Sequence, residues 1–194
     1  MYYVFAYILF PLNLETLLYI YYDHNLVYFY EYGGFPAVMG AIDGTIVRIK
    51  PPSTNEEAYV GRKEEHAINC QVVCDINGKF MDAVVRWPGS VHDSTIWQLS
   101  GVKTVIESFV ESQGPHYKGW LLGDSGYPQR EIMMVPLLDE NLTSQQRSYN
   151  KAHKKCRCSI ERAIGVKMKI YIEEYFLMTI YFIDINHLYF TRSL

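Results

Sequence analysis

The sequence predicts a single domain of the α/β class, in which helices cover both faces of a mixed β-sheet. The chain has 194 residues, 49% of them hydrophobic, which is enough to bury one core. Three strand-like segments follow one another in the first half, and the last two are joined by a hairpin signal. An amphipathic helix then leads to a further apolar segment, and a crossover helix of this kind is typical of a mixed sheet.

The first half of this sheet is expected to be an antiparallel meander. Its first strand places Asp43 on the same face as Thr45 and Val47. The next two strands flank Asn77-Gly78, the strongest short signal for a hairpin. We therefore expect strands at residues 38–49, 66–75 and 80–87.

The second half alternates helices and short strands. Apolar residues recur at i, i+3, i+4, i+7 and i+8 from Val102, which indicates a helix that covers one face of the sheet. Thr143 and Gln146 form the capping-box pattern that starts a helix. The expected elements are helices at 94–100 and 102–110, strands at 120–123 and 132–135, and a final helix at 143–169 that is broken near Cys156.

The two ends of the chain differ in composition from the middle. Residues 1–34 and 170–194 are atypical segments crowded with Tyr, Phe and Ile, and we expect residues 35–169 to form the functional domain. No apolar run approaches the ~18 residues that span a bilayer, so no membrane association is expected. The four cysteines show neither the density of a disulfide framework nor CxxC spacing, which favours a reducing, intracellular compartment.

A basic stretch interrupts a chain whose net charge is −3. Between residues 147 and 169 the only acid is Glu161, and the basic residues are Arg147, Lys151, Lys154, Lys155, Arg157, Arg162, Lys167 and Lys169. Such a helix face could contact nucleic-acid phosphates, although an ordinary solvated helix explains the same charge equally well. The candidate phosphate contacts are Lys151, Lys154, Lys155, Arg157 and Arg162.

Three carboxylates are candidates for a metal site. Asp43 lies in the first strand, Asp124 ends the fourth and Glu161 lies on the last helix. Mg²⁺ and Mn²⁺ prefer oxygen ligands, and two such ions ~4 Å apart can promote in-line attack on a phosphodiester. Each residue also has a simpler explanation: a turn aspartate at 43, an Asx-turn to Gly126 at 124, and an ion pair between Glu161 and Arg157 at i−4.

Two further groups of side chains could carry chemistry. His92 and Asp93 stand at the start of a helix, where we expect Asp93 to accept backbone N–H groups; an accessory catalytic role is the alternative. Cys156, Cys158 and His153 could be read as a zinc site, but residues at i and i+2 of a helix point in different directions. We therefore expect no zinc.

Four segments of the chain form a recognisable series: GAIDGT, INCQVVCDINGKFMDAVVRWPGSVHDS, GWLLGDSGYP and RSYNKAHKKCRCSIERAIGVKMK. Together they resemble the nuclease domain of PIF/Harbinger transposases and of the nucleases derived from them, from about Phe35 to Lys169. The resemblance implies an RNase H-like fold and a catalytic triad of Asp43, Asp124 and Glu161 that holds divalent Mg²⁺ or Mn²⁺. The implied activity is two-metal hydrolysis of phosphodiester bonds in DNA by an endonuclease.

The chain departs from that family in two ways. The family usually has a His after DGT, where this chain has Ile46. Family members also carry an N-terminal DNA-binding region and further C-terminal helices, where this chain has its tyrosine-rich ends, so we expect an isolated nuclease core. The alternative function is an inactive, domesticated or truncated transposase fragment that binds DNA or a protein. The resemblance implies a Myb/SANT-like DNA-binding partner and a location in the nucleus, with the cytoplasm left open.

Overall fold

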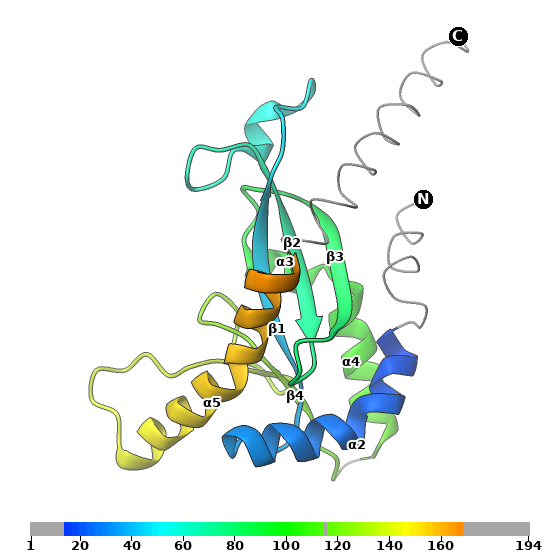
Figure 1. Ribbon diagram of the computed structural model, residues 1–194, viewed down its shortest axis with the longest axis vertical. Helices are drawn as coiled ribbons and strands as arrows, with labels where there is room; N and C mark the ends of the chain where they lie inside the picture. Colours follow the sequence, from blue (N-terminus) through cyan, green and yellow to red (C-terminus); the bar gives the residue numbers. More distant parts are fainter. Residues whose placement is uncertain (1–13, 115, 169–194) are drawn as a thin grey trace.

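The sheet has five strands in the order β3-β2-β1-β4-β5, and helices lie on both of its faces (Figure 1). The computed structural model describes residues 14–114 and 116–168. This arrangement confirms the predicted α/β class with a mixed sheet and is consistent with an RNase H-like fold. The strands are β1 (Val38–Arg48), β2 (Ala67–Cys74), β3 (Phe80–Pro88), β4 (Trp120–Leu122) and β5 (Met133–Met134).

β1, β2 and β3 form the antiparallel meander that the sequence predicts. Asp75 closes the turn between β2 and β3, because its Oδ1 accepts hydrogen bonds from the backbone N–H groups of Asn77 (2.9 Å) and Lys79 (2.7 Å). Gly78 has a φ of 71°, a left-handed conformation that favours glycine. A turn of 3₁₀ helix, η1 (Glu56–Tyr59), lies in the long connection between β1 and β2.

Two helices, α3 (Asp93–Gln98) and α4 (Gly101–Ser112), carry the chain from β3 to β4. β4 lies beside β1 and runs parallel to it, with Gly40 opposite Leu121 and Ala41 opposite Leu122. β5 pairs with β4, again in parallel. Because β1 and β4 run in the same direction, the residues that follow β4 lie beside the middle of β1.

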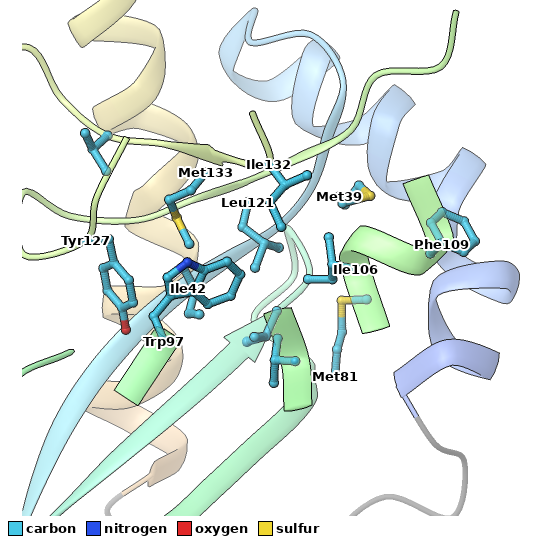
Figure 2. Packing of buried hydrophobic residues seen from close by; sticks show 13 residues of the cluster. Met39, Ile42, Met81, Trp97, Ile106, Phe109, Leu121, Tyr127, Ile132 and Met133 are labelled. Carbon is cyan, nitrogen blue, oxygen red and sulfur yellow. The ribbon is translucent and has the colours of Figure 1, made fainter. Parts of the chain in front are cut away.

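One face of the sheet packs against α3 and α4. Trp97 and Ile106 from these helices form a buried cluster with the strand residues Ile42, Leu121 and Met133 (Figure 2). These five side chains are fully buried. In Figure 2 these side chains point toward one another between the sheet and the helices. The predicted role of α4 as the cover of one sheet face is therefore confirmed.

The opposite face is covered by α5 (Ser144–Ala163), which begins with a capping box between Thr143 and Gln146. Ile160 of this helix belongs to the same buried cluster as Ala41 of β1. The break expected near Cys156 is wrong. The helix continues through this residue, because its side chain is fully buried in a cluster with apolar residues of α2 and the sheet. A π-helical turn, η2 (Ile164–Met168), follows α5.

A long helix, α2 (Leu14–Gly33), packs against β1 and α5 (Figure 1). Asn25 Nδ2 donates a hydrogen bond to the carbonyl of Met39 (2.8 Å), and Cys156 Sγ donates to the carbonyl of Phe29 (3.5 Å). Gly33 permits this close approach, since an added Cβ would lie 2.0 Å from Cys156 Sγ. The domain boundary expected after residue 34 thus falls at the end of a helix that is packed onto the domain.

The outer parts of the tyrosine-rich ends, residues 1–13 and 170–194, lie outside the described residues. The expectations for them stay predictions. Among the residues that are described, no helix is both long enough and apolar enough to cross a membrane.

Candidate active site

The parallel register of β1 and β4 brings two aspartates side by side. Ala41 lies opposite Leu122 in this register. Two residues further along, β1 reaches Asp43 and the chain leaving β4 reaches Asp124. Asp124 Oδ1 accepts a hydrogen bond from the backbone N–H of Gly126 (2.8 Å), so the Asx-turn considered from the sequence is present. This turn holds the carboxylate at the end of β4, beside Asp43.

Asp43 has the electrostatics of a crowded acidic site. Its side chain is 16% exposed, and burial raises the pKa of its carboxyl group to about 6. The positive charge of Arg157 lowers this pKa, whereas the negative charges of Asp124 and Asp93 raise it. A hydrogen bond to Asp43 Oδ1 from the backbone N–H of Gly44 (3.0 Å) also lowers it. Several carboxylates therefore lie close enough for their charges to act on Asp43, an arrangement that is more common at functional sites than elsewhere.

Glu161 reaches this site through Arg157. The guanidinium of Arg157 donates from Nη1 to Glu161 Oε1 and from Nη2 to Asp43 Oδ2, the second at 3.0 Å. The ion pair at i−4 that the sequence suggests is thus present, and it extends from α5 across to β1. The side chain of Glu161 is 55% exposed, whereas that of Arg157 is only 13% exposed. The structure therefore places Glu161 at the outer rim of the site.

Asp93 lies on the other side of Asp43, against the backbone of β1. Its Oδ1 accepts a hydrogen bond from Asn69 Nδ2 (3.0 Å), and the same amide nitrogen donates to the carbonyl of Val91 (2.9 Å). A Cβ added to Gly44 would meet Asp93 Oδ1 at 2.2 Å. The capping role expected for Asp93 needs correction: a side chain of β2 holds its carboxylate. His92 is the N-cap residue of α3, and its Nδ1 lies 2.8 Å from Arg62 Nη2.

We expect Gly44→Ala to disturb the site without disrupting the sheet. The new methyl group would displace the Asp93 carboxylate and break its hydrogen bond from Asn69. Overpacking of this kind costs about 1–3 kcal/mol, which urea unfolding would measure. Gly101→Ala is the matched control, because nothing lies within 4 Å of an added Cβ there. Equal stability of Gly44→Ala and the wild type would contradict this placement of Asp93.

Tyr127 adds a hydroxyl group that sequence analysis did not identify. The residue is 3% exposed, and within the described part of the chain its hydroxyl has no hydrogen-bond partner. Burial raises the pKa of Tyr127 well above its usual value, and the nearby charges of Asp93, Asp43 and Asp124 raise it further. Its position three residues after Asp124 was the available signal. Asn69 and Gly44 gave no such signal, because their contacts with Asp93 depend on tertiary structure.

The remaining basic residues of α5 form an exposed face. Lys151, Lys154, Lys155 and Arg162 are exposed, whereas Arg157 points inward to Asp43. The cations of Lys155 and Arg162 lie 5.1 Å and 5.9 Å from the ring centre of Tyr32 in α2. Four of the five candidate phosphate contacts are thus accessible, and Arg157 is already engaged by carboxylates.

Two possible metal sites can be compared by their donor atoms. In the described ranges, no three His, Cys, Asp or Glu side chains are grouped closely enough to hold a metal ion. His153 Nε2 lies 3.1 Å from the carbonyl oxygen of Met134, and Cys156 is buried against α2 and the sheet. Asp43, Asp124 and Glu161 supply only carboxylate oxygens, the donors that Mg²⁺ and Mn²⁺ prefer. Their chemistry fits such an ion, although Arg157 is hydrogen-bonded to one oxygen of Asp43 and to one oxygen of Glu161.

Comparison with known proteins identifies similar sequences over most of the chain. Residues 42–172 match the family described as DDE superfamily endonuclease. "Putative nuclease HARBI1" of Homo sapiens is 39% identical over 69% of this chain and 37% of its own length. The Xenopus laevis protein of the same name is 33% identical over 69% of this chain and 37% of its own length.

A plant relative is more distant. "Protein ALP1-like" of Arabidopsis thaliana is 23% identical over 71% of this chain and 36% of its own length. The chain thus spans a little over a third of the length of these relatives, 37% and 36%. No solved structure matches the chain.

Proposed function

Because the chain belongs to the DDE superfamily endonuclease family and has relatives among transposase-derived nucleases, we propose that it is a metal-dependent DNA endonuclease of transposase origin. One observation carries this proposal. The parallel register of β1 and β4 sets Asp43 beside Asp124. The helix that covers this face of the sheet, α5, carries Glu161. An aspartate in the middle of β1, a second one just after β4 and a carboxylate on α5 could together supply the oxygen ligands for the two metal ions of such a hydrolysis.

Asp43, Asp124 and Glu161 are the residues that would hold two Mg²⁺ or Mn²⁺ ions. The ions would activate a water molecule and stabilise the leaving oxygen of the phosphodiester. The chain's own contribution is to orient these carboxylates. The Asx-turn to Gly126 fixes Asp124, and the backbone N–H of Gly44 fixes one oxygen of Asp43. Asp93, held by Asn69, adds negative charge beside Asp43 and so favours a cation there.

The exposed basic face of α5 would guide the DNA strand. Lys151, Lys154, Lys155 and Arg162 stand on the helix that also carries Glu161. Exposed Lys and Arg side chains contact phosphates without regard to sequence, which orients a strand but does not select a target. Target selection would then fall to a separate Myb/SANT-like DNA-binding protein, and the site of action would be the nucleus.

The second candidate function is an inactive transposase-derived domain that binds DNA or a protein. Two observations favour it. Ile46, three residues after Asp43, is 52% exposed on β1 and offers no polar group to the site. Arg157 also occupies both Asp43 and Glu161 with hydrogen bonds.

Incubation of the purified chain with supercoiled plasmid DNA separates the two functions. An endonuclease would nick or linearise the plasmid when Mg²⁺ or Mn²⁺ is present and would stop when EDTA removes the ion. Binding to DNA in a gel-shift assay, with no cleavage in either metal, would instead support the inactive domain. Cleavage that persists in EDTA would contradict the two-metal proposal.

A further inference from the structure

Arg157 is the inward-facing cation of α5. Its side chain is 13% exposed, whereas Lys154 and Lys155 on the preceding turn are exposed. One guanidinium nitrogen pairs with Asp43 Oδ2 at 3.0 Å and the other pairs with Glu161. The planar guanidinium can bind two carboxylates at once, which a point charge such as an ammonium does less well.

The carboxylates need a positive charge in this position. Asp43 is 16% exposed at its side chain, and a partly buried carboxylate that faces other negative charges is unfavourable without a counter-charge. Arg157 is the cation that acts on Asp43, against the negative charges of Asp124 and Asp93. It therefore supplies, from within the chain, the charge that a metal ion would supply.

We propose that Arg157 is a positioning residue that takes the place of a cation in the metal-free site. It holds Glu161 of α5 over Asp43 of β1, and it competes for the same carboxylate oxygens that a divalent ion needs. A divalent ion can therefore bind only by displacing the ion pairs of Arg157 with Asp43 and Glu161, so stronger ion pairs mean weaker metal binding. This inference rests on the proposed metal-dependent function, but it concerns the binding equilibrium and not the rate of cleavage.

The first test compares Mn²⁺ binding by the wild type and Arg157→Gln, using calorimetry at constant pH and ionic strength. Removal of the competing charge should tighten Mn²⁺ binding by about tenfold or more. The metal-free variant should also melt at a temperature roughly 5 °C or more below that of the wild type, because Asp43 and Glu161 lose their counter-charge. Saturating Mn²⁺ should restore most of that difference, since it stabilises the variant more strongly.

Three further variants make the test specific. Arg48→Gln is the control. Arg48 also pairs with a carboxylate, Glu65 at 2.7 Å, but the two side chains are 73% and 40% exposed. This substitution should change neither the Mn²⁺ affinity nor the melting temperature. Asp124→Asn should weaken Mn²⁺ binding both as a single substitution and when it is combined with Arg157→Gln. This result would show that the ion binds at Asp124. Arg157→Lys keeps the positive charge but cannot bind both carboxylates as the guanidinium does. Its Mn²⁺ affinity should therefore lie between those of the wild type and Arg157→Gln. It also serves if Arg157→Gln does not fold.

Each outcome decides the proposal. Mn²⁺ binding by Arg157→Gln or Arg157→Lys that is no tighter than that of the wild type would overturn it. If the wild type binds no Mn²⁺ and Arg157→Gln does, competition by Arg157 is supported. If no variant binds Mn²⁺, this inference and the metal-dependent function both fail. Tighter binding by the variant with no cleavage by the wild type would uphold the inference while the proposed function fails.

Discussion

Asp124→Asn should lower the rate of metal-dependent cleavage of plasmid DNA roughly 10²–10³-fold below that of the wild type. A catalytic metal ion contributes several kcal/mol of transition-state stabilisation, and each 1.36 kcal/mol is a factor of ten in rate. The substitution removes one negative charge from the pair formed with Asp43. It leaves an amide oxygen that can still accept the hydrogen bond from Gly126, so the turn should persist. The loss would therefore report on metal chemistry and not on folding.

The matched control for this variant is Asp139→Asn. Asp139 is exposed and lies in the connection before α5. Its substitution should leave the cleavage rate within about twofold, because an isolated surface change is close to neutral. The melting temperatures of both variants, measured without metal, would show that each is folded. A cleavage rate for Asp124→Asn close to that of the wild type would remove Asp124 from the proposed triad.

Trp97→Ala should cost about 3–5 kcal/mol in the free energy of unfolding. Trp97 is fully buried in the cluster between the sheet and α3 and α4 (Figure 2). Its ring meets that of Tyr127 edge to face, with ring centroids 6.5 Å apart. Removal of the indole would leave a cavity beneath α3, the short helix that starts at Asp93. Urea unfolding followed by circular dichroism would measure the loss.

Leu99→Ala provides the comparison, because Leu99 directly follows α3 and is 58% exposed. This substitution should change the free energy of unfolding by no more than about 0.5 kcal/mol. If Trp97→Ala were equally mild, the indole could not lie in the closed cluster that Figure 2 shows. The cleavage rate of Trp97→Ala at low temperature would show whether activity depends on this packing.

Local sequence signals were sufficient for most of the fold. Residue alternation and the turn at Asn77-Gly78 predicted the meander, and the periodic apolar residues of α4 predicted the crossover. These features depend on neighbours within a few positions, which is why they can be recognised without tertiary contacts. The same reasoning placed Asp124 at the tip of a buried strand. This reasoning failed at Cys156, where a break in the last helix was expected. The helix is continuous there, because Cys156 is buried against α2, a contact that the local sequence does not reveal.

The details of the site depend on contacts between distant segments. Arg157 and Asp43 are 114 residues apart, so whether Arg157 faces solvent or a carboxylate is set by how α5 packs on the sheet. Asn69 and Asp93 meet across 24 residues because β2 and the start of α3 lie next to each other. The sequence therefore identified the carboxylates by their strand and helix positions. Long-range packing determined which of them face one another, which cation neutralises them, and how far Glu161 stands from the centre of the site.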